Sequence, residues 1–257
     1  ATGTIKNMVT RFSNSLSDTY ERIRMQMILL GLIHCDETGT RVDGKTWWVH
    51  NASNPDFTFL SIDTKRGWLG MEAAGILPNY HGIIVHDCWV SYWKYPDCIH
   101  AICCAHLLRE LNGVEENHPE QTWAGKFKEL LLEMKRVKDK TLLQDKDVVS
   151  YYHLHKFDKQ YDEIIKTAYE ENPLPEVTTK KRGRKKKTKV LNLIDRLVNY
   201  KASVCLFIKN LCVPFDNNLA ERDLRMIKVK TKVSGCFRSE EGATGISYNH
   251  ELYWDCS

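Results

Sequence analysis

Hydrophobic residues recur every three or four positions over residues 1–28, and this spacing predicts helix at the start of the chain. The pattern changes at Leu29, where the apolar run LLGLIHCD indicates a strand that ends in the carboxylate of Asp36. The next residues, TRVDGKTWWVH, predict two strands joined at Asp43 and Gly44, a dipeptide typical of a tight hairpin turn. The segment FTFLSID then gives the third strand of a meander.

A later apolar strand also ends in a carboxylate. The segment HGIIVHD has the continuous apolar character of a strand buried in a parallel sheet, and it ends at Asp87. A helix is expected over 68–77 before it, and a short irregular piece and a fifth strand around 98–104 after it. This order predicts an α/β fold, a mixed five-stranded sheet with flanking helices. Its first and fourth strands would be neighbours, which would bring Asp36 and Asp87 together.

From residue 105 to about 207 the chain shows only helical periodicity. We therefore predict a large all-helical insertion in the α/β domain. The expected helices cover 106–114, 123–137, 148–171 and 190–209. The predicted organisation is a helical leader (1–28), the first part of the core (29–104), the insertion (105–212) and the second part of the core (213–257).

The second part of the core opens with VPFDNNLAERDLRMIKVKTKVSGCFR, which predicts a helix with candidate N-caps at Asp216, Asn217 and Asn218. Three apolar residues share one face that can be buried: Ala220, Leu224 and Ile227. Three charged residues repeat that spacing about 100° further round the helix: Glu221, Arg225 and Lys228. An acid that helps to hold a metal, beside cations that hold phosphates, suits a site that cuts phosphodiesters. Alternatively, Asn218 and Glu221 form a capping box that only closes the first turn.

Charge and cysteine content narrow the class of protein. The 257 residues carry a formal net charge of +4, and eight of the ten residues over 180–189 are cationic, a run that is either solvated or bound to nucleic acid. No apolar run approaches the roughly 20 residues of a membrane span. The nine cysteines are odd in number, which favours a reducing, cytoplasmic location over a disulfide framework. The chain does not begin with Met, so we expect it to be part of a longer product.

Two aspartates at the ends of neighbouring strands and a glutamate on a later helix could form a carboxylate triad. Hard oxygen ligands of this kind suit Mg²⁺ or Mn²⁺. Two such ions can activate an attacking hydroxyl and stabilise the leaving oxygen of an in-line displacement. Taken singly, Asp36 or Asp87 could instead cap the turn that follows its strand.

Four segments resemble the transposases of the insertion-sequence-66 family: HCDETGTRVDGKTWWVH, GIIVHDCWVSY, AICCAHLLREL and VPFDNNLAERDLRMIKVKTKVSGCFRS. The resemblance spans roughly residues 20–242 and implies a DDE transposase with an RNase H-like core and a helical insertion before the glutamate. It implies that Asp36, Asp87 and Glu221 are the catalytic residues and hold two Mg²⁺ or Mn²⁺ ions. The expected chemistry is hydrolysis at the transposon end, followed by attack of the freed 3′-hydroxyl on target DNA.

The same resemblance implies roles for residues around the triad. Those expected to bind DNA are Arg222, Arg225, Lys228, Lys230 and Lys232. The charge of the run over 180–189, and not the resemblance, adds Lys181, Arg182, Arg184 and Lys185 to this set. Those expected to shape the site are Cys103, His106, Arg109, Asn217 and Asn218. Cys103 and His106 match a Cys-x-x-His signature found in several DDE families, with zinc binding as the alternative to a site-shaping role. For the cations after Glu221 the alternative is a solvated helix face.

The family pattern also sets expectations for partners and for the chain ends. We expect DNA as the partner, a homo-oligomer on DNA, accessory proteins of the same element, no membrane and a bacterial, nucleoid-associated location. From the family pattern we expect that the N-terminal region that usually recognises transposon ends is not included in this chain. At the other end, NHELYWDC becomes similar to the family's last helix after a one-base frameshift, so we hypothesise a decayed C-terminus. Two other functions stay open, a non-catalytic DNA-binding remnant and a metal-dependent nuclease.

Overall fold

The computed structural model describes residues 2–173 and 187–249. The chain divides into two compact units, one made of Ala1–His100 and Asn217–Ser257 and the other of Ala101–Asp216. The basic residues Lys181, Arg182, Arg184 and Lys185 lie outside the described residues, as does all but Asn249 of the segment in which we hypothesise a frameshift. Among the described residues, no helix combines the length and the apolar character that a membrane span requires.

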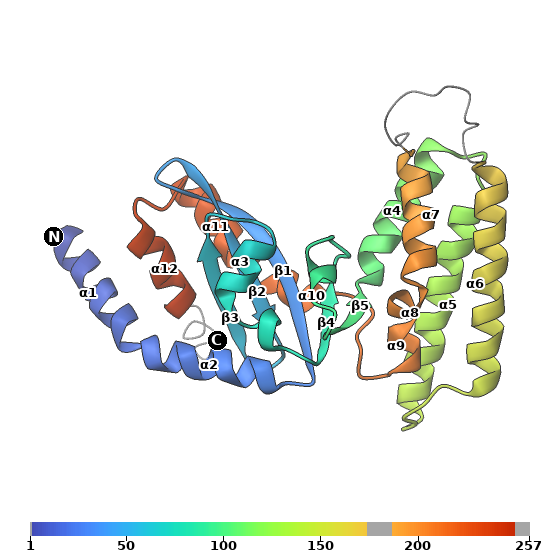
Figure 1. Cartoon of the computed structure of the whole chain (residues 1–257), viewed down its shortest axis with the longest axis horizontal. Coiled ribbons are helices and arrows are strands. Elements are labelled where there is room, and N and C mark those ends of the chain that lie inside the picture. The colour runs from blue at the N-terminus through green and yellow to red at the C-terminus, as the bar shows by residue number, and fades with distance from the viewer. Residues whose placement is uncertain (1, 174–186, 250–257) are drawn as a thin grey trace. The chain divides into compact units, whose positions relative to one another are not determined.

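A five-stranded sheet with the order β3-β2-β1-β4-β5 forms the centre of the first unit (Figure 1). Strand β1 pairs antiparallel with β2 and parallel with β4, and β2 pairs antiparallel with β3. The strands are β1 (Leu32–Val42), β2 (Lys45–Ser53), β3 (Thr58–Asp63), β4 (Ile83–His86) and β5 (Ile99–Ile102). The predicted mixed α/β sheet of the RNase H-like class is therefore confirmed, including the parallel contact between the first and fourth strands.

The hairpin between β1 and β2 turns at the predicted dipeptide. Asp43 and Gly44 have φ values of 46° and 72°, the left-handed conformation that both central residues of a type I′ turn require. Val42 and Lys45 are the last pair of the ladder before the turn. The conformation of this turn thus sets the register of the hairpin, and the register decides which face of the sheet each side chain of β1 and β2 occupies.

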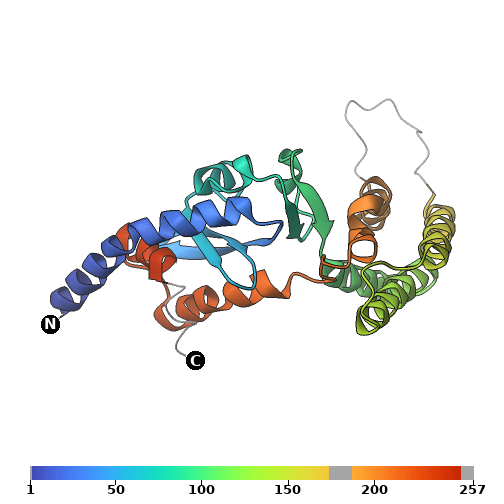
Figure 2. The same cartoon turned by 90° about the horizontal axis from the view of Figure 1, so that it is seen from below.

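Helices cover both faces of the sheet, as Figure 2 shows for α2 (Ser17–Leu29) on one side and α11 (Arg225–Ser234) on the other. On the first face, buried side chains from α2, from α3 (Trp68–Ala74) and from the strands form one apolar cluster. On the second face, Leu224 and Ile227 pack against Val49 and Leu60. The predicted burial of Ala220, Leu224 and Ile227 is confirmed, since each is at most 2% exposed. The prediction of one helix is wrong, because the structure has two, α10 (Asn218–Asp223) and α11, which are divided at Leu224.

The remaining elements of the first unit are short or lie at the chain ends. They are α1 (Thr2–Ser15), the 3₁₀ turns η1 (Leu77–Asn79) and η2 (Tyr92–Lys94), α10 (Asn218–Asp223) and α12 (Glu240–Asn249). The expected helix over 68–77 ends early, because Gly75 adopts a left-handed conformation with φ of 72° and closes α3. Beyond α11, Phe237 accepts a backbone hydrogen bond from Asp43 and donates one to Arg41, which attaches this segment to the end of β1.

The second unit is helical between β5 and Asp216. Its helices are α4 (Cys104–Asn117), α5 (Trp123–Leu143), α6 (Tyr151–Glu171), α7 (Lys189–Asn199), α8 (Lys201–Val204) and α9 (Leu206–Lys209). The prediction of one helix over 190–209 is wrong, because the chain leaves the helical conformation at Tyr200 and Cys205. Part of the reason is long-range: the Tyr161 hydroxyl donates to the Leu197 carbonyl at 2.7 Å, the group that would accept the Lys201 N–H in a continuous helix.

Candidate active site

The parallel pairing of β1 and β4 sets Asp36 and Asp87 at matching positions. The last pair in the register is His34 with Val85, and each aspartate lies two residues beyond it along its own strand direction. The carboxyl ends of parallel strands meet at the same edge of a sheet, so both carboxylates belong to one region. Neither is fully buried. The charge of Asp87 is near enough to Asp36 to raise its pKa.

The electrostatics of Asp36 show how crowded with negative charge this region is. The pKa of Asp36 is raised to about 7, first by burial and then by the charges of Glu37 and Asp87. A hydrogen bond of 2.9 Å from the Glu37 N–H to Oδ1 of Asp36 and the charge of Lys228 lower the pKa, but do not cancel the increase. A cation bound between the carboxylates would relieve this repulsion.

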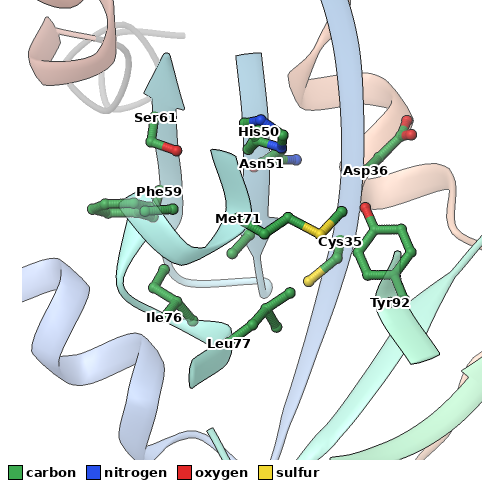
Figure 3. Close-up of a pocket in the computed structure, with 12 residues that line it drawn as sticks. Cys35, Asp36, His50, Asn51, Phe59, Ser61, Met71, Ile76, Leu77 and Tyr92 are labelled. Atoms are coloured by element: carbon green, nitrogen blue, oxygen red, sulfur yellow. The ribbon is translucent and has the colours of Figure 1, made fainter. Parts of the chain in front are cut away.

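The Asp36 carboxylate lies on the face of the sheet that α10 covers. Figure 3 shows it pointing away from Cys35, whose sulfur lies on the opposite side of β1. A small cavity of about 20 Å³ beside β1 is lined by residues such as Cys35, Phe59, Met71 and Tyr92, and also by Asp36 and Asn51. A cavity of this volume holds about one water molecule. It is too small for a nucleotide, so the candidate site lies on the α10 face.

The helix that carries Glu221 is attached to three adjacent strands. The Asn51 amide, cross-strand partner of Asp36 on β2, donates to the Ala220 carbonyl at 3.3 Å. Thr58 on β3 donates to Asp223 Oδ2 at 3.0 Å, and the Asp223 side chain is only 2% exposed. The third attachment is to β1 and is made by Asn217. Because Ala220 directly precedes Glu221, these contacts fix the start of α10 over the strand that carries Asp36.

Asn217 makes the attachment to β1 and is 1% exposed. Its Oδ1 lies 2.8 Å from Nδ1 of His34, and its Nδ2 donates to the Cys35 carbonyl at 2.8 Å. Asn217 is the N-cap residue of α10, but its side chain makes no capping hydrogen bond. The predicted N-cap position is thus confirmed, whereas the side chain binds β1 and not the helix. Asn218 is the exposed first residue of α10.

The cations that follow Glu221 are all exposed, and the structure separates them into different surroundings. Lys228 is near enough to Asp36 to lower its pKa. Lys230 lies over the ring of Phe237, 4.7 Å from the ring centre, and partial burial lowers its pKa. Arg222 approaches Asp223 at 3.8 Å, and the other two of the five, Arg225 and Lys232, are also exposed on α11.

Cys103, His106 and Arg109 belong to the second unit. Cys103 is fully buried at the N-cap position of α4, and its carbonyl accepts the backbone N–H of His106 at 3.2 Å. His106 is half-buried and Arg109 is exposed in the first half of the same helix. The Cys-x-x-His signature is therefore the first turn of a helix, a conformation that brings these two residues onto neighbouring positions.

Glu37, a buried carboxylate next to Asp36 in the chain, was not predicted as a functional residue. Its side chain is 2% exposed, and it is bonded to Tyr92 and Arg66. A signal was present: strand alternation puts Glu37 on the same face as Cys35, and a charged residue at a core-facing position requires a partner.

Comparison with known proteins supports the resemblance found in the sequence. The family model described as Transposase IS66 family matches residues 1–245. No curated protein matches the chain.

Proposed function

Because the chain belongs to the IS66 family of transposases, we propose that it cuts phosphodiester bonds at the ends of a mobile DNA element and joins the freed 3′-hydroxyl to target DNA. The family gives the chain a general role in DNA transposition. The observation that best supports the specific chemistry is the matched position of Asp36 and Asp87 at the ends of parallel strands. The attachment of the Glu221 helix over Asp36 supports it further.

The donor set fits divalent metal ions. Asp36, Asp87 and Glu221 offer carboxylate oxygens, the ligands that Mg²⁺ and Mn²⁺ prefer. Burial raises the pKa of Asp36, as do the charges of Glu37 and Asp87, and a bound cation would favour the ionised carboxylate. When bound, two such ions supply an activated attacking hydroxyl and stabilisation of the leaving oxygen. We propose that these three residues hold them.

The chain's own cations would orient DNA at this site. Lys228, already close to Asp36, is suited to a phosphate next to the reacting one. The other cations of the proposed set would contact phosphates along the strand, and such contacts make affinity fall steeply with salt. We propose this role for Arg222, Arg225, Lys230, Lys232, Lys181, Arg182, Arg184 and Lys185. We propose that Cys103, His106, Arg109, Asn217 and Asn218 shape the surroundings of the site.

The family also suggests how the protein works in the cell. Transposition needs two DNA ends, so we propose that the chain acts as a homo-oligomer on DNA. Accessory proteins from the same element and a cytoplasmic, nucleoid-associated location complete this proposal. Oligomer formation is open to a direct measurement, the mass of the protein–DNA complex in solution.

The experiment that tests the function compares the unchanged protein with Glu221→Gln in two assays that contain Mn²⁺. One measures nicking of a supercoiled plasmid, and the other measures joining of a labelled oligonucleotide with a free 3′-hydroxyl into that plasmid. The matched control is Glu240→Gln, which removes an exposed carboxylate at the start of α12. We expect nicking and joining for the unchanged protein and the control, and neither for Glu221→Gln.

Each of the other possible results of these assays would indicate a different function. Nicking without joining would identify a nuclease on this fold. DNA binding without Mn²⁺-dependent nicking in the unchanged protein would identify a non-catalytic DNA-binding remnant. Equal nicking by Glu221→Gln and the unchanged protein would remove Glu221 from the proposed triad and leave it a structural role in α10.

A further inference from the structure

Glu37 is a buried carboxylate that the proposed function leaves without a role. It follows Asp36 on β1, so its side chain points to the opposite face of the sheet. The side chain is 2% exposed. Burying a charge without compensation destabilises the folded protein, so the partners of Glu37 must be well placed.

The partners of Glu37 come from two other parts of the first unit. Tyr92, in η2, donates its hydroxyl hydrogen to Oε2 at 2.9 Å. Arg66, in the connection between β3 and α3, reaches Oε1 with Nη2 at 3.0 Å and Nε at 3.3 Å. Both carboxylate oxygens are thus engaged, one by each partner.

Tyr92 is tied to the segment that carries Asp87. The Tyr92 N–H donates to the Trp89 carbonyl at 3.2 Å, and the Trp89 N–H donates to Oδ1 of Asp87 at 2.9 Å. The Tyr92 ring also stacks on His86, the residue before Asp87, with 4.6 Å between ring centres. A fixed Tyr92 therefore fixes the turn on which Asp87 lies.

Arg66 reaches the same segment by a second route. Its guanidinium carbon lies 4.4 Å from the centre of the Trp89 ring and 4.7 Å from that of Trp48 on β2. Cation–π contacts of this kind attract the guanidinium to the faces of both rings. Both partners of Glu37 thus connect β1, beside Asp36, with the segment beside Asp87.

A different use of this cluster would be a surface for stacking DNA bases on Trp48 and Trp89. Two observations disfavour it. The Arg66 guanidinium already lies over both indole rings. Its charge is also neutralised by the buried Glu37 carboxylate, which leaves little attraction for a phosphate.

We propose that Glu37 is a positioning residue that acts through Tyr92 and Arg66 to hold Asp87 in place relative to Asp36, so that the two carboxylates can share divalent cations. This inference rests on the proposed function. Groups that orient metal ligands typically change metal affinity by about 10–100-fold when they are removed.

The test measures Mn²⁺ affinity by electron paramagnetic resonance for Tyr92→Phe and Glu37→Gln, beside DNA affinity without metal and thermal unfolding. The matched control is Tyr20→Phe, because the Tyr20 hydroxyl donates to the Leu60 carbonyl at 2.9 Å in the same unit but away from the carboxylates. We expect Tyr92→Phe and Glu37→Gln to weaken Mn²⁺ binding at least tenfold with DNA affinity unchanged. Plasmid nicking by Tyr92→Phe should recover as Mn²⁺ is raised. The control should bind Mn²⁺ like the unchanged protein.

The outcomes separate this inference from the proposed function. If the unchanged protein binds Mn²⁺ through Glu221 and both variants bind it equally well, the positioning role is wrong and the proposed function stands. An equal loss in Tyr20→Phe would also overturn the positioning role, since it would show general loosening of the unit. If the unchanged protein binds no Mn²⁺, or binds it independently of Glu221, the proposed function and this inference both fall.

Discussion

Asn217 lies with its Oδ1 2.8 Å from Nδ1 of His34, a residue 183 positions earlier in the chain. The oxygen of an amide only accepts, so His34 carries its hydrogen on Nδ1. The other side of the same amide donates to the carbonyl of Cys35. One buried side chain therefore joins the strand that carries Asp36 to the helix that carries Glu221.

Replacing Asn217 by Ala should loosen this junction. We expect Asn217→Ala to lower the free energy of unfolding by about 2–3 kcal/mol, because two buried partners lose a hydrogen bond. Mn²⁺ affinity should fall with it, as the Glu221 helix loses its attachment to β1. Urea unfolding measures the first effect and calorimetric titration the second.

The control for this prediction is Asn79→Ala, in which the lost hydrogen bond to the Gly75 carbonyl is exposed. Surface substitutions of this kind change stability by no more than about 0.5 kcal/mol. An Asn217→Ala protein as stable as the control would show that the amide does not hold the two elements together.

Neutralising Asp36 should stabilise the protein while it removes function. Its pKa is raised to about 7, so between pH 4 and pH 7 the folded protein binds more protons at this group than the unfolded chain does. Stability from this group is therefore lost as the pH rises through 7. We expect Asp36→Asn to be about 1–3 kcal/mol more stable at pH 8 without divalent ions, since one pKa unit is about 1.4 kcal/mol and partial exposure reduces the full shift.

With divalent metal present, the unchanged protein should become more stable than Asp36→Asn. Mn²⁺ binds the folded state and should raise the unfolding temperature of the unchanged protein, but not that of Asp36→Asn. Scanning calorimetry at pH 8 with and without Mn²⁺ measures both effects. A destabilised Asp36→Asn protein in metal-free buffer would contradict the idea that burial and the neighbouring negative charges disfavour the ionised carboxylate.

The parts of the fold that local rules specify could be predicted from the sequence. Continuous apolar runs ending in Asp36 and Asp87 indicated the two parallel strands, and the dipeptide at residues 43 and 44 indicated the hairpin. The buried face of the Glu221 helix followed from the spacing of its apolar residues. Each of these signals depends on neighbours within one turn or one strand.

The parts that depend on distant partners could not be predicted. Glu37 is balanced by Tyr92 and Arg66, which lie 55 and 29 positions away in the chain. Local rules gave Asn217 a capping role, whereas its side chain found partners on β1. Near the end of α7, the Leu197 carbonyl accepts a hydrogen bond from the Tyr161 hydroxyl on α6. A single sequence does not state which polar groups meet across a fold.

Gly70 is required in α3 because no side chain fits there. A Cβ atom at this position would lie 2.2 Å from the Lys65 carbonyl oxygen and 2.4 Å from Nε2 of His50. We expect Gly70→Ala to cost about 3 kcal/mol or more in stability, because a backbone carbonyl must move. A Cβ atom added at Gly113 in α4 would meet nothing within 4 Å, so Gly113→Ala should instead stabilise the protein by about 1 kcal/mol. Chemical denaturation of the two variants gives the signs, and a stable Gly70→Ala protein would refute the steric argument.

A chain of hydrogen bonds with a fixed direction runs through two histidines beside Asp87. The Cys88 N–H donates to Nδ1 of His86 at 3.0 Å, so His86 carries its hydrogen on Nε2. That nitrogen lies 3.1 Å from Nδ1 of His100, and Nε2 of His100 lies 3.0 Å from the Tyr95 carbonyl. When both rings are neutral, each of the four ring nitrogens of His86 and His100 takes part in a hydrogen bond. A further proton on His100 would face the N–H of His86.

These hydrogen bonds through His86 and His100 should make the stability of the first unit sensitive to acid. Burial lowers the pKa of His86, and His100 lowers it further; burial also lowers the pKa of His100, against a hydrogen bond to Tyr95. Below about pH 6.5 the unfolded chain therefore binds more protons at these groups than the folded protein does, and stability falls as the pH falls. The loss is limited to about 1.4 kcal/mol per pH unit for each group. Because the pKa of Asp36 is raised to about 7, protonation of Asp36 increases stability as the pH falls in part of this range. The measurement must therefore compare variants that share this contribution.

We expect His100→Gln to lose less stability than the unchanged protein between pH 7.5 and 5.5, because Gln cannot gain a proton. Urea unfolding at both pH values measures the difference, from which the contribution of Asp36 cancels. The control is His81→Gln, which replaces an exposed histidine shortly before β4 begins and should keep the pH dependence of the unchanged protein. If His100→Gln and His81→Gln lose the same stability over this range, the two-histidine chain does not set the acid sensitivity of the unit.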